Sequence, residues 1–281
     1  MADNKRMSKS PTMNDVAKEA GVSVATVSRV INGNYAVSKK LERKVNNAMK
    51  KLHYHPSALA RSFKMQETRQ IGLIVPLLDH PFFSRMAQVM EQELFRNDYR
   101  AIICNTEEDP QREIEYIDLL LRQRVDGIII NSATNTISYL DDLQAQNVPT
   151  VLIDRNIETQ KASKVFSDNI MGGYLGMKYL IELGHRHIIV VAPFSTASPI
   201  QQRIHGIHQA LEEFGIPKDP NMFITSDDHS FDFGVSIGNQ LMQMNPRPTA
   251  VFALTDVTAI GIMRACWQLG LHIPDDVSVM G

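Results

Sequence analysis

The chain has 281 residues and a formal net charge of −2, and its 43% hydrophobic and 21% charged content is typical of a globular protein of about two domains. Its two cysteines, Cys104 and Cys266, match no metal or redox spacing, so we expect neither a metal nor a cofactor. Without an N-terminal secretory signal or an apolar run long enough to span a bilayer, we expect a cytoplasmic protein with no membrane partner.

The charge is distributed unevenly along the chain. Residues 1–64 hold 13 Lys and Arg against four Asp and Glu, a net charge of +9, whereas the remainder has a net charge of −11. A basic head on an acidic body indicates a polyanion as the partner of the head. A basic surface that is only solvated would have the same charge, so the charge alone leaves both interpretations open.

The first predicted helix lies near the N-terminus. Residues 1–10 are polar without periodicity, and we expect them to form a disordered tail. Thr12 is a suitable N-cap, and Asp15 completes a variant of the capping box. The helix covers residues 13–20, and Gly21 ends it.

Two further helices follow at the spacing of a helix-turn-helix. Ser23 can cap a helix over residues 24–31, in which Val27 and the residues near its end turn inward. A third helix begins after Ser38 and carries lysine and arginine on its outer faces. Small alanine in the first helix, glycine in the turn and valines in the second helix form the pattern that a helix-turn-helix requires.

The outer face of the second helix has short side chains. With the valines turned inward, this face consists of Val24, Ala25, Thr26, Ser28 and Arg29. Such a helix can enter the major groove, where Ser and Thr reach phosphates and Arg29 can donate two hydrogen bonds to guanine. A three-helix bundle without a nucleic-acid role is the alternative, but spacing, hydroxyl groups and charge together favour DNA binding.

The segment "TMNDVAKEAGVSVATVSRVINGNYAVSKKLERKVNNAMKKLHYHPSALARSFK" resembles the DNA-binding headpiece of the lactose/galactose repressor family (LacI/GalR), and the resemblance continues through most of the chain. It implies a headpiece over residues 11–56, followed by a hinge helix and linker over residues 57–69. It also implies that the full-length protein is a homodimer on a near-palindromic operator of double-stranded DNA. The residues expected to contact DNA are Thr12, Ser23, Val24, Ala25, Thr26, Ser28, Arg29, Asn32, Ala60 and Phe63.

The linker contains one large apolar residue. Pro56 stops the third helix, and Ser57 can cap a short helix, "ALARSFK". In the family this hinge helix orders on DNA, pairs with its dimer mate and wedges an apolar side chain between base pairs of the minor groove. Family members usually carry Leu at the place of Phe63, so the bulk of Phe leaves the details of the kink open. Packing of Phe63 on the body is the alternative.

From Gln70 the pattern becomes that of a parallel α/β protein, with apolar runs alternating with amphipathic helices. The first series contains "IGLIVP", "RAIICNT", "VDGIIIN" and "PTVLID", and the second contains "KVFSDN", "RHIIVVAP", "MFITS" and "PTAVFALT". We therefore expect two α/β subdomains, over residues 70–155 and 156–281, with a cleft between them. The family resemblance implies the same body, similar to periplasmic sugar-binding proteins and closing around a small effector.

Ligands of open α/β sheets lie beyond the carboxyl ends of the strands, and several residues of this chain fall there. Phe82 or Phe83 could stack on a sugar ring, and Phe83 is the better candidate for the core. Arg203 can donate a pair of hydrogen bonds to ligand hydroxyls or a carboxylate. His229 takes a place where the family often has an aromatic residue in the pocket.

Two aspartates also follow strands, Asp154 after the fourth and Asp256 after "VFALT". Helix capping or a contact between the subdomains is the alternative role for both. The effector-binding residues expected from position and resemblance are Phe82, Asp154, Arg203, His229 and Asp256.

Three functions account for some or all of these features. A DNA-binding transcriptional regulator, controlled by a small metabolite with a sugar as the favoured class, uses both the head and the body. A sugar-binding transport protein would need a signal peptide and would have no use for the basic head. A sugar-handling enzyme would need catalytic carboxylates or a phosphate loop, and "GGYLG" lacks the spacing of a dinucleotide loop. The regulator is favoured, as a repressor on family grounds, and no enzymatic activity is expected.

The sequence stops at Gly281, just after a predicted strand, "VSVM". By resemblance a family member continues with an aromatic–Asp pair and with elements that return to complete both subdomains. The expectation is therefore a chain whose C-terminal part is missing, with an apolar surface and a strand edge exposed. Such a chain should respond poorly to an effector, and its body should be prone to aggregation.

Overall fold

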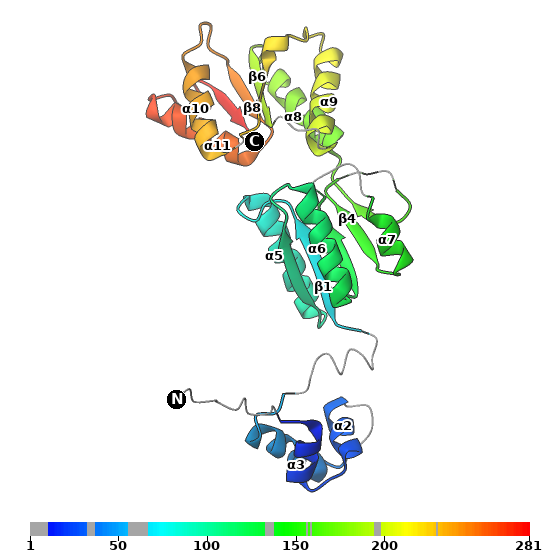
Figure 1. Ribbon diagram of the computed structural model, residues 1–281. Coiled ribbons are helices and arrows are strands. Elements are labelled where there is room, and N and C mark those ends of the chain that lie inside the picture. Colours follow the sequence, from blue (N-terminus) through cyan, green and yellow to red (C-terminus); the bar gives the residue numbers. More distant parts are fainter. Residues whose placement is uncertain are drawn as a thin grey trace, which may run out of the picture. The chain divides into compact units, whose positions relative to one another are not determined.

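The computed structural model describes residues 11–32, 37–55, 67–132, 138–155, 157, 159–193, 198–228 and 230–281. The chain divides into two compact units, Met1–Thr68 and Arg69–Gly281 (Figure 1). Each unit has a hydrophobic core of its own. Across the described ranges, no helix combines the length and the apolar character needed to cross a bilayer.

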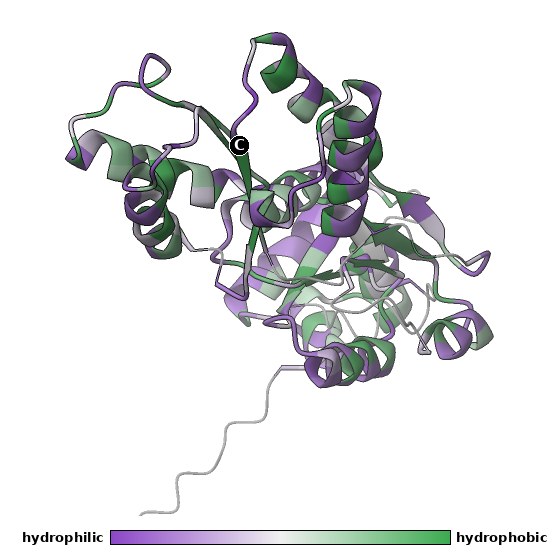
Figure 2. Cartoon of the chain, turned by 90° about the horizontal axis from the view of Figure 1, so that it is seen from above, coloured by the Kyte–Doolittle hydropathy of each residue, from purple (hydrophilic) through white to green (hydrophobic). Residues whose placement is uncertain are grey.

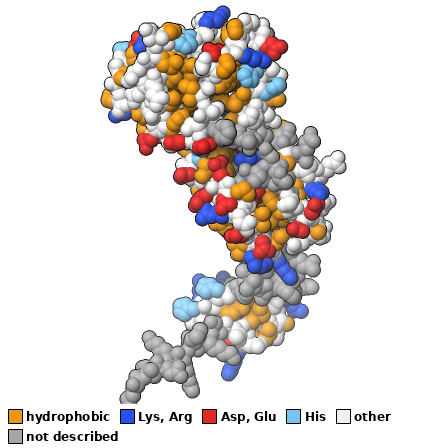
Figure 3. Space-filling view, turned by 45° about the horizontal axis from the view of Figure 1, so that its top comes forward, with side chains coloured by type: hydrophobic (Ala, Val, Ile, Leu, Met, Phe, Trp, Pro, Cys, Tyr) orange, Lys and Arg blue, Asp and Glu red, His pale blue; other side chains and the backbone are white. Residues whose placement is uncertain are grey.

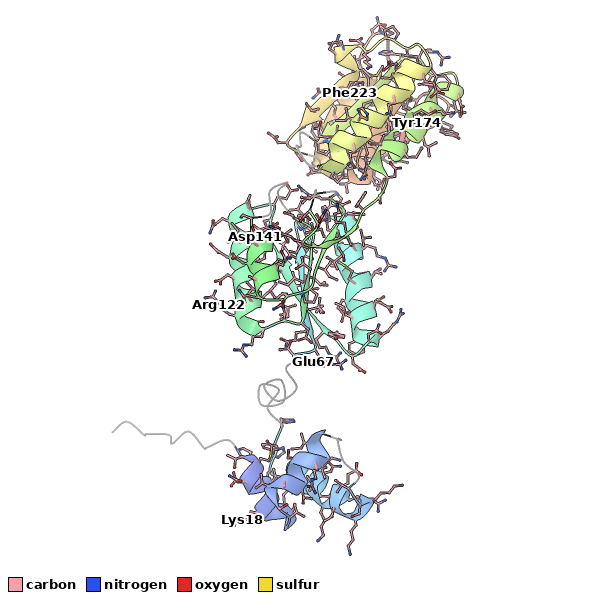
Figure 4. The ribbon with its side chains drawn as sticks, turned by 90° about the vertical axis from the view of Figure 1, so that its right-hand side faces the viewer. Lys18, Glu67, Arg122, Asp141, Tyr174 and Phe223 are labelled. Carbon is pink, nitrogen blue, oxygen red and sulfur yellow. The ribbon has the colours of Figure 1, made fainter. Side chains whose placement is uncertain are left out.

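The first unit is a small three-helix domain. Helices α1 (Met13–Ala20), α2 (Val24–Asn32) and α3 (Lys39–Lys51) share a core of small and branched side chains: Val16, Ala17, Ala20, Val27, Val45 and Ala48. Thr12 and Asp15 form the expected capping box. Gly21 ends α1 at a φ of +64°, a left-handed conformation that glycine adopts without a steric penalty. Lys18 of α1 is exposed, as its stick in Figure 4 shows.

The second unit begins with a five-stranded parallel sheet in the order β2-β1-β3-β4-β5. Its elements in chain order are β1 (Gln70–Val75), α5 (Pro81–Arg96), β2 (Arg100–Asn105), α6 (Pro110–Gln123), β3 (Gly127–Ile130), α7 (Leu140–Ala145), β4 (Thr150–Ile153) and β5 (Ser163–Val165). Because side chains alternate along a strand, each face needs its own cover. Helices α6 and α7 pack on one face, and α5 lies on the other (Figure 4).

This first sheet extends further along the chain than predicted. The expectation that "KVFSDN" opens the second series is wrong, because Ser163–Val165 pairs in parallel with residues 151–153 of β4. The sheet therefore runs past residue 155, where the subdomain boundary was expected. An apolar pattern identifies a strand, but the partner of that strand depends on the connection that leads to it.

A second sheet contains four parallel strands in the order β7-β6-β8-β9. Its elements are α8 (Asn169–Glu182), β6 (Ile188–Pro193), α9 (Ser198–Glu213), the 3-10 helix η1 (Pro220–Met222), β7 (Phe223–Ser226), α10 (Phe231–Met242), β8 (Ala250–Ala253), α11 (Asp256–Gln268) and β9 (Ser278–Met280). One buried cluster joins α8 and α9 to the sheet, and another joins α10 and α11 to it. The helices accordingly have a hydrophobic side and a hydrophilic side (Figure 2).

Glycines bring the helices of each layer into backbone contact. A Cβ on Gly173 of α8 would lie 2.0 Å from the carbonyl oxygen of Arg203 in α9, and one on Gly206 would lie 1.9 Å from that of Ile170. In the other layer, a Cβ on Gly261 of α11 would lie 2.3 Å from the carbonyl oxygen of Phe231 in α10. No side chain fits at these distances, so the crossings fix α9 against α8 and α11 against α10.

Apolar side chains also remain exposed on the second unit. On α8 and at its C-cap they recur every four residues and are 48–57% exposed: Met171, Leu175, Tyr179 and Leu183. On α11 they are 45–67% exposed: Ile260, Met263 and Trp267. Figure 3 shows hydrophobic side chains gathered on one face of the C-terminal part. Exposed apolar side chains grouped in this way are candidate contact surfaces.

Candidate functional site

The exposed face of α2 in the first unit matches the face predicted from sequence. Val27 is fully buried, whereas Val24 is 41% exposed and Ala25 and Arg29 are also exposed. Thr26 and Ser28 are half-buried at the flanks of this face. The helix therefore presents short side chains and one guanidinium group to solvent.

The N-terminus of α2 is held by hydroxyl groups. The Thr26 amide donates to Ser23 Oγ at 3.2 Å, and the two hydroxyl oxygens are 2.9 Å apart. Ser23 thus satisfies an amide of the first turn, as expected of an N-cap. At the start of α1, the Thr12 hydroxyl donates to Asp15 at 2.7 Å while remaining exposed.

Cations are also exposed on α3 of the same unit. The exposed basic residues of α3 are Lys39, Lys40, Arg43, Lys44, Lys50 and Lys51. Lys51 forms an ion pair with Glu19 of α1 at 2.6 Å. A helix with short side chains on its exposed face, within a basic domain, can approach a phosphate backbone and still bring Arg29 to the base edges. Of the other predicted DNA contacts, Ala60, Phe63 and the side chain of Asn32 lie outside the described part of the chain.

In the second unit, Asp154 lies at the carboxyl end of β4, as predicted. Its backbone adopts a left-handed φ of +68°, and its amide donates to the carbonyl oxygen of Val165 at 2.8 Å. Its carboxylate accepts a bond from the Asn131 side chain at 3.4 Å. The chain continues from Asp154 to β5, so the alternative role of helix cap does not apply.

Asn131, directly after β3, was not identified from the sequence. Its side chain is 1% exposed, and its Oδ1 has no hydrogen-bond partner among the described residues. A buried acceptor without a partner is unfavourable, and it is expected where a ligand supplies the missing donor. The signal that could have identified it is a polar residue directly after an apolar parallel strand.

Four buried polar residues surround this edge of the first sheet: Glu113, Ser132, Tyr139 and Arg155. The Glu113 carboxylate accepts hydrogen bonds from the Ser132 and Tyr139 hydroxyls. Burial, and then the negative charge of Glu113, raises the pKa of Tyr139, so this hydroxyl stays protonated and donates. Burial also lowers the pKa of Arg155, an effect that nearby acidic groups including Asp154 oppose.

Phe82 is exposed at the start of α5. It lies in the first turn of α5 and is 51% exposed, and its amide donates to the His80 ring at 3.3 Å. Phe83 is half-buried, with its ring centre 5.1 Å from that of Phe82 in an edge-on arrangement. The expectation that Phe82 rather than Phe83 faces a ligand is consistent with this difference in exposure.

Arg203 of α9 and Asp256 of α11 lie near the carboxyl end of β8 in the second sheet. Arg203 donates from Nε to Asn169 Oδ1 and from Nη1 to the carbonyl oxygen of Leu254, both at 3.0 Å. Part of its guanidinium group is thus used to fix the side chain in place. Asp256 is exposed at the start of α11, and the cap of that helix is Thr255 instead.

His229 lies outside the described residues. Within the described ranges, no three His, Cys, Asp or Glu side chains form a group that could hold a metal ion. Both cysteines are buried, and burial raises the pKa of the Cys104 thiol to about 11. Each unit therefore has its own candidate site: the exposed face of α2 in the first, and hydrogen-bonding groups at two sheet edges in the second.

Two family models match the chain. Residues 12–57 match the model described as "Bacterial regulatory proteins, lacI family". Residues 68–281 match the model described as "Periplasmic binding proteins and sugar binding domain of LacI family". These two matches correspond closely to the two compact units of the structure.

Individual proteins show the same similarity. The chain is 38% identical to the HTH-type transcriptional repressor PurR of Vibrio atlanticus, over 96% of this chain and 81% of that protein. It is 28% identical to the lac repressor dimer bound to operator and the anti-inducer ONPF, with a TM-score of 0.82 over 97% of this chain and 82% of that one. A LacI family regulator from Enterococcus faecium with bound ribose is 31% identical, with a TM-score of 0.67 over 75% of this chain and 77% of that one.

Proposed function

Because the chain belongs to the LacI family of bacterial regulatory proteins, and is thus a DNA-binding transcriptional repressor, we propose that a small metabolite controls its affinity for an operator. The single observation that supports DNA contact is the exposed face of α2, which has short side chains and Arg29. The effector would bind the groups at the two sheet edges, with Asn131 and Asp154 on one and Arg203 and Asp256 on the other. Because a bacterial transcriptional regulator binds DNA inside the cell, we place the protein in the cytoplasm.

The operator contact would use two copies of the chain. A helix-turn-helix reads a short half-site, and two copies related by a twofold axis read a near-palindrome. The exposed apolar face of α11, formed by Ile260, Met263 and Trp267, is a candidate surface for such a dimer. The hinge residues Ala60 and Phe63 are assigned to the minor groove by family resemblance.

A sugar is the effector class that we favour. The regulator from Enterococcus faecium that resembles this chain has ribose bound. Asn131 Oδ1, which has no partner among the described residues, and the Asp154 carboxylate are both hydrogen-bond acceptors, so the ligand should present N–H or O–H donors at this edge. Neighbouring hydroxyl groups of a sugar meet this requirement.

Two assays test the proposal. Selection of duplexes from a random DNA pool with the full chain should enrich a near-palindromic site, and a pool without enrichment would contradict sequence-specific binding. A thermal-shift screen against sugars including D-ribose, sugar phosphates and purines should then identify a compound that also changes the affinity for the selected site. A compound that stabilises the protein without changing DNA affinity is not the effector, and a screen in which no compound changes DNA affinity would contradict control by these classes.

A further inference from the structure

Glu113 is a buried carboxylate whose place in the molecule the proposed function does not explain. It lies in the first turn of α6 and is 1% exposed. Its Oε1 accepts hydrogen bonds from Tyr139 at 2.5 Å and from Ser132 at 2.8 Å. A carboxylate withdrawn from water is strongly unfavourable unless donors or a cation compensate it, so its partners are held tightly.

A buried cation belongs to the same cluster. Arg155 is 8% exposed, and both Asp154 and Glu113 act on its charge. Buried opposite charges interact strongly because little water screens them. The charge of Arg155 therefore interacts with the carboxylate of Glu113 as well as with that of its neighbour Asp154.

The cluster joins segments that are far apart in the sequence. Ser132 follows β3, Tyr139 precedes α7, and Arg155 follows β4. Asn131 directly precedes Ser132, and Asp154 directly precedes Arg155. Each of the two candidate effector contacts at this sheet edge thus has a member of the cluster as its chain neighbour.

Asp154 in particular needs such support. Its φ of +68° is a conformation that residues with a side chain adopt only at a cost in free energy. Its Oδ2 lies 3.4 Å from the side-chain Nδ2 of Asn131. This long hydrogen bond cannot hold the two side chains in place alone. The backbone amide bond of Asp154 to Val165 does not fix the side chain, and its chain neighbour Arg155 is a buried member of the cluster.

From this placement we infer that Glu113 is a positioning residue for the effector. Through Ser132, Tyr139 and Arg155 it holds the Asn131–Asp154 edge in the geometry that binds the ligand. The inference rests on the proposed function, because it takes Asn131 and Asp154 as effector contacts. Glu113 itself does not touch the ligand.

Hydrogen exchange of backbone amides tests the positioning without any ligand. The variants are Tyr139→Phe, which removes one donor and keeps the ring, and Glu113→Gln, which removes the charge. Matched controls lie on α6, the helix of Glu113. They are Tyr116→Phe, which alters a half-buried ring, and Glu115→Gln, which alters an exposed carboxylate. Circular dichroism verifies that each variant is folded.

The amides to compare lie at opposite ends of the first sheet. At the carboxyl end, the Asp154 amide donates to Val165 and the Asn131 amide to Ile74; at the amino end, the Asp126 amide donates to Gln70. In Tyr139→Phe and Glu113→Gln we expect exchange at the carboxyl end to be at least about tenfold faster and exchange of the Asp126 amide to be unchanged. Equal acceleration at both ends, or none, would overturn the inference, because the cluster would then only stabilise the fold or be dispensable.

Titration with D-ribose separates this inference from the proposed function. If the parent chain binds D-ribose and Asp154→Asn weakens binding, Tyr139→Phe should weaken it at least about tenfold, whereas Tyr116→Phe should not. Parent-like affinity in Tyr139→Phe would overturn the inference and leave the proposed function intact. If D-ribose does not bind the parent, the sugar assignment loses its support from the ribose-bound relative, while the exchange result still decides the role of Glu113.

Discussion

Replacement of Gly173 by alanine should show how tightly α8 and α9 are held together. The new Cβ would lie 2.0 Å from the carbonyl oxygen of Arg203, whereas ordinary contact begins at 3.4 Å. The two helices would therefore have to separate by roughly 1.4 Å, and no flexible side chain is present to give way. Addition of a methylene to a packed interior usually costs about 1–3 kcal/mol, and a backbone clash of this size places Gly173→Ala at about 3 kcal/mol.

The neighbouring glycine provides a matched control. Gly172 lies in the same turn of α8, and a Cβ added there would have nothing within 4 Å. Because alanine loses less conformational entropy than glycine in a helix, Gly172→Ala should stabilise the body by about 0.5–1 kcal/mol. The two variants add the same methyl group one residue apart, so their difference of about 4 kcal/mol reports the helix crossing alone.

Urea unfolding followed by far-UV circular dichroism measures both values. The expected result is a lower transition midpoint for Gly173→Ala and a slightly higher one for Gly172→Ala, with unchanged slopes. If Gly173→Ala were as stable as Gly172→Ala, the result would contradict the close backbone contact between α8 and α9. The fixed position of Arg203 on α9 would then lose its explanation.

Three further substitutions test the two units. Arg203→Ala should abolish the response of DNA binding to any effector, because the ligand would lose a hydrogen-bond donor, while DNA binding without effector should survive. Equal effector affinity for variant and parent in calorimetry would show that Arg203 does not bind the effector. Phe63→Ala should reduce DNA bending measured by fluorescence energy transfer, and an unaltered bend would assign Phe63 to packing on the body. Thr12→Ala removes the hydroxyl side of the capping box and should destabilise the headpiece by about 0.5–2 kcal/mol in thermal unfolding, and an unchanged headpiece transition would show that the cap contributes nothing.

Local signals in the sequence were sufficient for the headpiece. The capping box at Thr12 and Asp15, the glycine at the end of α1 and the buried Val27 are all set by residues within a few positions of one another. The same holds for the alternation of strands and helices in the body, including β7 and β9. Periodicity and capping are local, so a single sequence reports them.

Features that depend on distant contacts were not predicted. Glu113 falls within an amphipathic helix, where a glutamate normally lies in water, and its burial depends on hydroxyl groups 19 and 26 residues away. The partner of β5 and the protein groups that bind Arg203 also come from distant segments. A sequence pattern shows which residues are polar, but not which of them will be buried together.

The central claim is that the exposed face of α2 reads a DNA sequence, and one measurement tests it most directly. Affinities of the full chain for its selected site and for random duplex DNA are compared in parent and Arg29→Ala over a series of salt concentrations. We expect Arg29→Ala to lose about 1–3 kcal/mol on the selected site and little on random DNA, with preference relaxed at one base position. An unchanged ratio of selected-site to random affinity in Arg29→Ala would contradict the assignment of α2 to the major groove.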